Sequence, residues 1–169
     1  MNKLIVKKAA VLGAGVMGAQ IAAHLANANV PVVLFDLPAR EGDKNGVVKK
    51  ALDGLKRLEP GPLANKGRLK FIDAANYDEH LPLLAECDLV IEAIAERMDW
   101  KNDLYAKIAP HLSADAVIAS NTSGLSINML ADTLPAAIRP RFCGIHFFNP
   151  PRYMHLVEII PTRSSDAGT

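Results

Sequence analysis

The sequence predicts an α/β fold: a doubly wound, mostly parallel sheet with an antiparallel strand pair at its C-terminal end. Three observations support this prediction. Apolar runs of strand length alternate with helical stretches, a pattern typical of parallel strands joined by crossover helices. The glycine-rich string GAGVMG lies between the first such run and the first helical stretch. The last two runs, FCGIHFF and MHLVEII, are separated only by residues 149–153, so they can fold back on each other.

The first half of the chain contains two regular units and then an irregular segment. The first predicted strand is Ala9 to Leu12, and a helix of good helix formers follows from Val16 to about Asn29. VPVVLFD, residues 30–36, is the second strand. A helical stretch at 46–58 comes next, followed by a turn at 59–67 that contains proline and glycine. We interpret this segment as an excursion away from the sheet.

The second half returns to the alternating pattern. LKFID, residues 69–73, is predicted to bring the chain back to the sheet, and DLVIEAI, residues 88–94, is a further buried strand. MDWKNDLYAKIAPHL places its apolar residues on one helical face, which ends near Pro110. AVIASN, residues 116–121, is the next strand, and a short helix follows near 126–131.

Size and composition exclude several classes of protein. The 169 residues have the length of one ordinary domain, and half of them are apolar, as in globular proteins. The formal net charge is +1, so no global field recruits nucleic acid or an anionic membrane. Apolar runs are interrupted well before the ~18 residues of a membrane span, and the basic N-terminus is not followed by the uninterrupted apolar core that is typical of a signal peptide. We expect no nucleic-acid partner, no membrane insertion and no secretion.

The two cysteines, Cys87 and Cys143, lie beside or within apolar segments. They form no CxxC motif, and no histidine stands at ligand spacing from either. We interpret both as buried reduced thiols, and we expect no metal site. Reduced thiols fit a cytoplasmic protein best.

GAGVMG, Gly13 to Gly18, matches the pattern G-x-G-x-x-G. Alone the pattern is weak evidence, but here it leaves a strand and opens a helix. Gly13 permits the tight turn, Gly15 lets the backbone approach a pyrophosphate, and Gly18 lets the helix pack closely on the strand. The helix start, with Val16 and Met17, supplies free N–H groups and a positive dipole end for the phosphates. The motif therefore predicts a dinucleotide site on a Rossmann-type sheet.

Asp36 is the last residue of the predicted second strand. A carboxylate there accepts hydrogen bonds from the ribose hydroxyls of the adenosine half of the cofactor. Because it repels a 2′-phosphate, Asp36 favours NAD over NADP, and Arg40 is the nearby cation that argues otherwise. The alternative is a doubly wound sheet with a tight first turn that binds no nucleotide.

The segment HFFNPPRYMHLVE carries a histidine at one end and a glutamate at the other. Burying either group is costly unless it finds a partner. An antiparallel pair folded about Arg152 places His146 opposite Glu158, where the carboxylate fixes the imidazole tautomer while the second nitrogen faces a substrate. The alternative is a structural His–Glu bond near the sheet edge.

Oxidation of an alcohol by hydride loss also releases a proton, so the reaction needs a base, and His146 is the candidate. Asn121 and Ser123 follow the AVIAS strand at its C-terminal end, where ligands of open α/β sheets bind. Ser123 can hydrogen-bond the reacting oxygen, or it can cap a helix that begins at Leu125.

Together these residues resemble the NAD-binding domain of the L-3-hydroxyacyl-CoA dehydrogenases of fatty-acid β-oxidation. The resemblance covers nearly all of the chain, and its most specific part is HFFNP with Glu158 nine residues beyond Asn149. It is carried by VLGAGVMGAQIA, the strand that ends at Asp36, DLVIEAIAE with Lys101 after it, ASNTSG, and HFFNPPRYMHLVEII.

The resemblance implies roles for individual residues. His146 is similar to the family's catalytic base and Glu158 to its orienting carboxylate, while Ser123 and Asn149 correspond to polar residues near the substrate oxygen and the nicotinamide. The cofactor site that it implies also includes Glu96, Lys101 and Asn121. The basic stretch at 49–57 falls where the family contacts the phosphates of coenzyme A, although a solvated helix face has the same composition.

Two departures from the family pattern stand out. Gly124 replaces a second serine, which puts one polar contact or the rigidity of the loop in doubt. The family also continues into a helical C-terminal domain that closes the acyl cleft and forms the dimer interface. We therefore expect residues 1–169 to be one dinucleotide-binding domain, a fragment of a longer homo-oligomeric protein. PGPLANKGRL resembles large bacterial forms that carry a fused hydratase-like domain.

The sequence thus predicts an NAD-dependent oxidoreductase acting on L-3-hydroxyacyl-CoA thioesters. Two alternatives stay open. The first is an NAD-binding module or fragment without significant turnover. The second is a dehydrogenase of another acid or a sugar nucleotide, which has no use for the HFFNP arrangement.

Overall fold

The computed structural model describes residues 4–166 of the chain. Its strands are β1 (Ala9–Leu12), β2 (Val32–Asp36), β3 (Ile72–Asn76), β4 (Leu89–Glu92), β5 (Val117–Ser120), β6 (Phe142–Phe147) and β7 (Val157–Pro161). Its α-helices are α1 (Val16–Asn27), α2 (Gly46–Leu55), α3 (Met98–Ile108) and α4 (Ile127–Thr133). Short 3-10 helices are η1 (Lys66–Phe71), η2 (Leu81–Glu86), η3 (Ala109–His111) and η4 (Arg139–Arg141).

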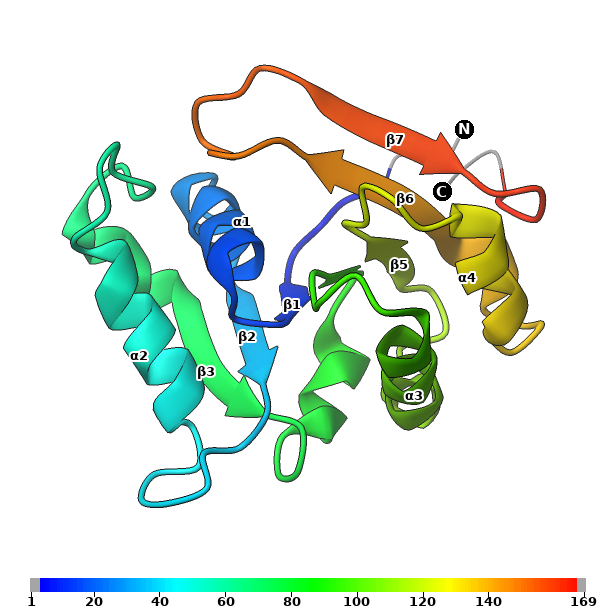
Figure 1. Cartoon of the computed structure of the whole chain (residues 1–169), viewed down its shortest axis with the longest axis horizontal. Helices are drawn as coiled ribbons and strands as arrows, with labels where there is room; N and C mark the ends of the chain where they lie inside the picture. Colours follow the sequence, from blue (N-terminus) through cyan, green and yellow to red (C-terminus); the bar gives the residue numbers. More distant parts are fainter. Residues whose placement is uncertain (1–3, 167–169) are drawn as a thin grey trace.

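The strands form one sheet in the order β3-β2-β1-β4-β5-β6-β7. Helices α1 and α2 pack on one face of this sheet, and α3 and α4 pack on the other (Figure 1). The first five neighbour pairs in this order are parallel, and β6 and β7 are antiparallel. Strand order reverses between β1 and β4, which is the position where doubly wound sheets bind ligands. The predicted fold class is confirmed.

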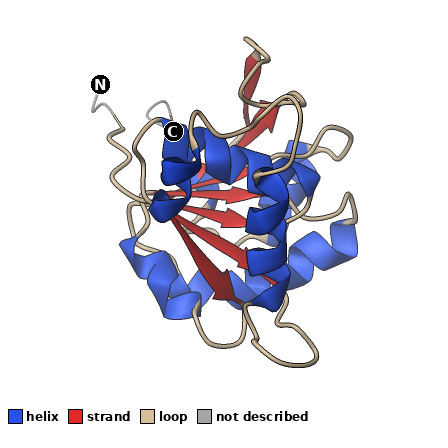
Figure 2. Cartoon of the chain, turned by 90° about the vertical axis from the view of Figure 1, so that its left-hand side faces the viewer, coloured by secondary structure: helices blue, strands red, loops and turns tan. Residues whose placement is uncertain are grey.

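Helices cover both faces of the sheet (Figure 2), which explains why β1 is apolar throughout and why β4 and β5 are apolar up to their last residues, Glu92 and Ser120. In β1, Ala9 and Val11 pack with α1 and α2, while Ala10 and Leu12 pack with α3 and α4. All four are fully buried. An apolar core on each face therefore holds the carboxyl ends of the parallel strands in place.

The predicted return strand at 69–73 is displaced. Residues up to Phe71 form η1, and β3 begins only at Ile72. The ring of Phe71 lies beneath the cationic groups of Arg68 and Lys70, at 5.7 and 5.4 Å, rather than in the sheet. The strand itself carries Ala74-Ala75-Asn76, which have low strand propensity, so the sequence pattern pointed to the wrong residues.

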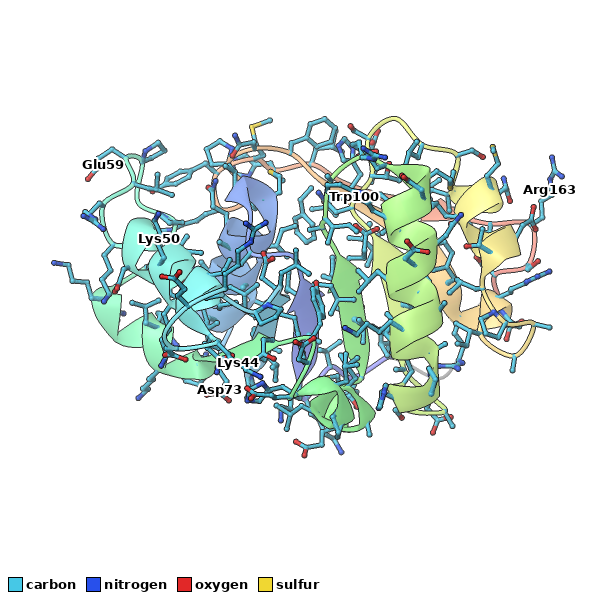
Figure 3. All side chains as sticks on the ribbon, turned by 60° about the horizontal axis from the view of Figure 1, so that its bottom comes forward. Lys44, Lys50, Glu59, Asp73, Trp100 and Arg163 are labelled. Atoms are coloured by element: carbon cyan, nitrogen blue, oxygen red, sulfur yellow. The ribbon has the colours of Figure 1, made fainter. Side chains whose placement is uncertain are left out.

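The part of the excursion that follows α2, residues 59–67, is hydrogen-bonded to the turn between β6 and β7. Arg152 Nη1 donates to the carbonyl oxygens of Gly61 and Leu63, both at 2.7 Å, and the Tyr153 hydroxyl donates to Gly61 O at 2.8 Å. Asn27 of α1 also contacts this segment, because its Nδ2 donates to Pro62 O at 2.9 Å. The excursion, which begins near Glu59 (Figure 3), is therefore fixed to both elements.

Both cysteines are buried free thiols, as predicted. Burial raises the pKa of Cys87 and of Cys143 to about 11, so both stay protonated at neutral pH. In the part of the chain that the structure describes, no helix is both long enough and apolar enough to cross a membrane.

A buried charged cluster joins β4, β5 and α3. Glu92 is 0% exposed, and its Oε1 lies 2.6 Å from the Nζ of the equally buried Lys101. Its Oε2 accepts hydrogen bonds from Tyr105 Oη at 2.9 Å and Ser120 Oγ at 2.6 Å, and Oε1 also accepts from the backbone N–H of Ile94 at 2.7 Å. Four donors thus offset the cost of burying one carboxylate.

We predict that Lys101→Met lowers the free energy of unfolding by roughly 3 kcal/mol, because it leaves the Glu92 carboxylate buried without its counter-ion. Urea denaturation followed by circular dichroism measures the change. Lys107→Met is the matched control, since Lys107 is on the same helix but forms only a half-exposed pair with Asp78 at 3.5 Å. That variant is expected to cost less than about 1 kcal/mol. Equal losses in the two variants would refute the role of the buried pair.

Candidate active site

The glycine turn after β1 has the geometry of a phosphate cradle. Gly13 has φ +100°, and a Cβ there would lie 2.9 Å from Ala93 O. A Cβ on Gly18 would lie 1.8 Å from Gly13 O, so only glycine allows this approach of α1 to the turn. At Gly15 a Cβ would meet no atom within 4 Å, which leaves open space beside the helix start. The tight turn predicted at Gly13 and the close helix packing predicted at Gly18 agree with this geometry, and the approach of a pyrophosphate to Gly15 stays a prediction.

Asp36 lies at the end of β2, directly beside the glycine turn. Its Oδ2 accepts from the backbone N–H of Ala14 at 2.6 Å, and its Oδ1 accepts from that of Leu37 at 2.7 Å. Both bonds hold the carboxylate at the carboxyl edge of the sheet. An anionic acceptor therefore stands where the sequence predicted a partner for ribose hydroxyls.

Two adjoining cavities follow this edge. The first, of about 480 Å³, is lined by Asp36 and the glycine turn, and its other members include Tyr77 and Trp100, which lies near the start of α3 (Figure 3). The second, of about 600 Å³, contains His146 and Ser123. They share four residues: Gly15, Ala93, Ile94 and Ala95. The two cavities, one beside Asp36 and the other beside His146, therefore adjoin at the glycine turn and at residues 93–95.

His146 and Glu158 are in contact. They are partners in the β6–β7 register, and His146 Nδ1 lies 2.8 Å from Glu158 Oε2. The imidazole also packs against the Phe148 ring, with centroids 4.5 Å apart. A proton on Nδ1 donates to the carboxylate, so Nε2 is the nitrogen left for a substrate. The predicted pairing is confirmed.

The loops after β4 and β5 are joined by one carboxylate. Glu96 Oε2 accepts from Thr122 Oγ1 at 2.6 Å, and Glu96 Oε1 accepts from the backbone N–H of Ser123 at 2.9 Å. Asn121 Oδ1 accepts from the backbone N–H of Phe147 at 2.9 Å, which attaches the second loop to β6. These side chains therefore fix the walls of the second cavity.

The helix cap considered for Ser123 belongs to other residues. Ser126 Oγ accepts from Met129 N at the start of α4, and Thr122 Oγ1 accepts from Leu125 N at 3.0 Å. Neither backbone group is bonded to Ser123, whose side chain lines the second cavity. The capping alternative is wrong, because the turn places the hydroxyl of Thr122 nearer to Leu125.

Val16, Met17 and Asn149 line the second cavity, and Asn149 Oδ1 accepts from Gln20 Nε2 at 3.3 Å. Gln20 is a buried polar residue of α1 that the motifs did not single out. Lys101 is buried and bonded to Glu92, so a contact between Lys101 and the cofactor stays a prediction.

The basic stretch at 49–57 lies along α2 and just after it. Two of its lysines pair with neighbouring carboxylates: Lys49 with Asp43 at 2.5 Å and Lys56 with Asp53 at 2.6 Å. Lys50 is exposed on the same helix (Figure 3). Both interpretations of this stretch, a contact for coenzyme A and a solvated face, stay open.

The first cavity fits the adenosine half of a dinucleotide. Gly15 leaves space that any side chain would fill, and Asp36 supplies an acceptor. Tyr77 adds a buried hydroxyl that has no hydrogen-bond partner among residues 4–166. The geometry of the chain is therefore consistent with a bound NAD, whose adenosine and nicotinamide ends would lie in the first and second cavities.

The profile of the family described as "3-hydroxyacyl-CoA dehydrogenase, NAD binding domain" matches residues 8–169. A Rickettsia felis protein named as a trifunctional enzyme of a fatty acid oxidation complex is 47% identical over 156 residues, which are 92% of this chain and 22% of that protein. A Deinococcus radiodurans protein named probable 3-hydroxyacyl-CoA dehydrogenase is 42% identical over 163 residues, 95% of this chain and 47% of that protein. The chain thus spans less than half of each relative.

Solved structures agree with the sequence relatives. The 3-hydroxybutyryl-CoA dehydrogenase of Escherichia coli superposes with a TM-score of 0.80 at 32% identity, over 97% of this chain and 34% of that one. The (S)-3-hydroxybutyryl-CoA dehydrogenase of Ralstonia eutropha gives 0.78 at 30% identity, over 96% of this chain and 56% of that one. Because the family profile covers almost the whole sequence, the chain belongs to the family of 3-hydroxyacyl-CoA dehydrogenase NAD-binding domains.

Proposed function

We propose that the chain is the NAD-binding, proton-transferring part of an enzyme that oxidises L-3-hydroxyacyl-CoA to 3-ketoacyl-CoA in fatty-acid β-oxidation. One observation carries the proposal: the His146–Glu158 pair, 2.8 Å apart, opens into a cavity that adjoins the one containing Asp36. A base and a dinucleotide cradle in adjoining cavities are the two parts that alcohol oxidation needs.

The acid–base chemistry follows from the pair. His146 Nε2 takes the proton from the C3 hydroxyl, and the Glu158 carboxylate at Nδ1 stabilises the imidazolium that forms. When bound, NAD supplies the nicotinamide that accepts the hydride from C3. Ser123 and Asn149 line the same cavity as His146 and are proposed to hold the substrate oxygen and the carboxamide. In the reverse direction His146 acts as the acid.

The cofactor is proposed to lie across the two adjoining cavities, with its pyrophosphate at the glycine turn. The contacts assigned to it are those of Gly13, Gly15, Val16, Met17, Gly18, Asp36, Glu96, Lys101 and Asn121. The relatives' names support an acyl-CoA substrate. We also propose a cytoplasmic location, which the two buried thiols support.

A second candidate function is a cofactor-binding module with little turnover of its own. One observation favours it: the Glu158 side chain is 49% exposed. Water screens an exposed ion pair and weakens its hold on the imidazole. We propose that in the whole protein a further helical domain covers this side of the site and forms a homo-oligomer.

The assay that tests the proposal measures NADH oxidation with acetoacetyl-CoA, alongside NADH binding by titration. Turnover by this chain that requires both NADH and acetoacetyl-CoA supports the enzyme proposal. If both this chain and a longer chain that carries the C-terminal part of a relative bind NADH without turnover, the enzyme proposal is excluded and the binding module is the function that remains. Turnover restored only by that longer chain would show that the domain needs its cover.

We predict that His146→Gln lowers turnover at least ~100-fold, because a positioned proton-transfer group contributes about that much. NADH affinity is expected to change less than ~2-fold, since glutamine has a volume close to that of histidine and the substitution leaves the glycine turn and Asp36 unchanged. Steady-state kinetics and NADH titration measure the two effects. His155→Gln is the control, because His155 lies outside both cavities. Unchanged turnover in His146→Gln would remove this residue from the mechanism.

We predict that Asp36→Ser weakens NADH binding roughly 10-fold or more, because hydrogen bonds to a charged group contribute about 1.5–3 kcal/mol. Affinity for NADPH is expected to fall less or to rise, since the charge that repels its 2′-phosphate is gone. Titration with both cofactors measures the ratio of affinities. Asp53 lies on α2, outside both cavities, so the control variant Asp53→Asn should leave the ratio of the two affinities unchanged. The same ratio in Asp36→Ser as in the unmodified chain would contradict this assignment.

A further inference from the structure

Tyr77 follows β3 directly and carries a hydroxyl that the fold leaves unsatisfied. The residue is 5% exposed, and its ring stacks on that of Phe35 with centroids 5.9 Å apart and planes 12° apart. Within residues 4–166, Tyr77 Oη has no hydrogen-bond partner. The backbone of Gly13 approaches the hydroxyl, but its N–H already donates to Phe35 O at 2.8 Å. An unpaired buried hydroxyl has lost water without gaining a replacement, so it needs an explanation.

Packing does not explain the oxygen. A phenylalanine ring would stack on Phe35 equally well and would bury no polar atom. Tyr105 is a useful contrast, because its hydroxyl is equally buried but donates to Glu92 Oε2 at 2.9 Å. One buried tyrosine thus uses its oxygen within the fold, and the other does not.

The position of Tyr77 indicates where a partner would come from. Its side chain lines the first cavity together with Asp36, Gly13 and Gly15. Its backbone N–H donates to Asp36 O at 3.2 Å, which fixes the residue beside the acid proposed to hold the ribose. Burial raises the pKa of the Tyr77 hydroxyl well above its ordinary range, so the group stays protonated and can donate.

We propose that Tyr77 is a cofactor-binding residue whose hydroxyl donates a hydrogen bond to an oxygen of the adenosine half of the dinucleotide. The inference rests on the proposed NAD site and extends it to a residue outside the glycine motif. The unsatisfied oxygen is then a donor kept ready for the ligand, and cofactor binding relieves the penalty that the free protein carries.

The chain contains a built-in reporter for the test. Trp100 is its single tryptophan and lines the same cavity as Tyr77. Binding of ADP-ribose, which contains the adenosine half, is expected to change Trp100 fluorescence, and nicotinamide mononucleotide at the same concentration is not. Calorimetry gives the dissociation constants independently of the reporter.

The decisive variant is Tyr77→Phe, which removes one oxygen. It is expected to bind ADP-ribose roughly 3- to 10-fold more weakly, the range for one net hydrogen bond. Its melting temperature without ligand is expected to stay the same or rise, because no internal bond is lost. Tyr105→Phe is the matched control: it loses the bond to Glu92, so its melting temperature should fall while its affinity for ADP-ribose stays within ~2-fold.

Each other outcome decides against the proposal. Unchanged ADP-ribose affinity in Tyr77→Phe would remove Tyr77 from the site and leave the proposed function intact. A clear fall in its melting temperature would assign the hydroxyl to the fold instead. Failure of the unmodified chain to bind ADP-ribose would overturn this inference together with the NAD site itself.

Discussion

The start of α1 lies against the turn after β1 because no side chain stands at position 18. A Cβ there would lie 1.8 Å from Gly13 O, far inside van der Waals contact. This approach fixes the direction of α1 and brings its first N–H groups to the carboxyl edge of the sheet. The open space at Gly15 and the place of Asp36 beside the turn both depend on this approach. A methyl group at position 18 would separate helix and strand and alter them together.

The second half of the site depends on register. Side chains of a strand alternate between faces, so a shift of one residue between β6 and β7 would place Glu158 away from His146. The hairpin is held to the rest of the site by Asn121, which bonds to Phe147 N, and by Gln20, which bonds to Asn149. The base is therefore positioned by three strands and a helix rather than by its carboxylate alone.

Much of this arrangement could be predicted from the sequence because the informative patterns are local. The glycine spacing, the acid after the second apolar run and the distance from His146 to Glu158 each encode one turn or one strand pair. Tyr77 could not be predicted, since its significance is the absence of a partner, which only the three-dimensional packing shows. The same holds for the bond from Gln20, 129 positions before Asn149. The start of β3 was misplaced because alanines in an edge strand carry little local signal.

The bonds from Arg152 to Gly61 and Leu63 join two segments about ninety positions apart in sequence. Neither the hairpin tip nor the excursion can detach without breaking the same contacts. The two should consequently open as one cooperative unit, with similar protection of their amide hydrogens from exchange. Local opening of the segment around Gly61 would then also displace Asn149, which lies three residues before Arg152, without any change at the centre of the sheet.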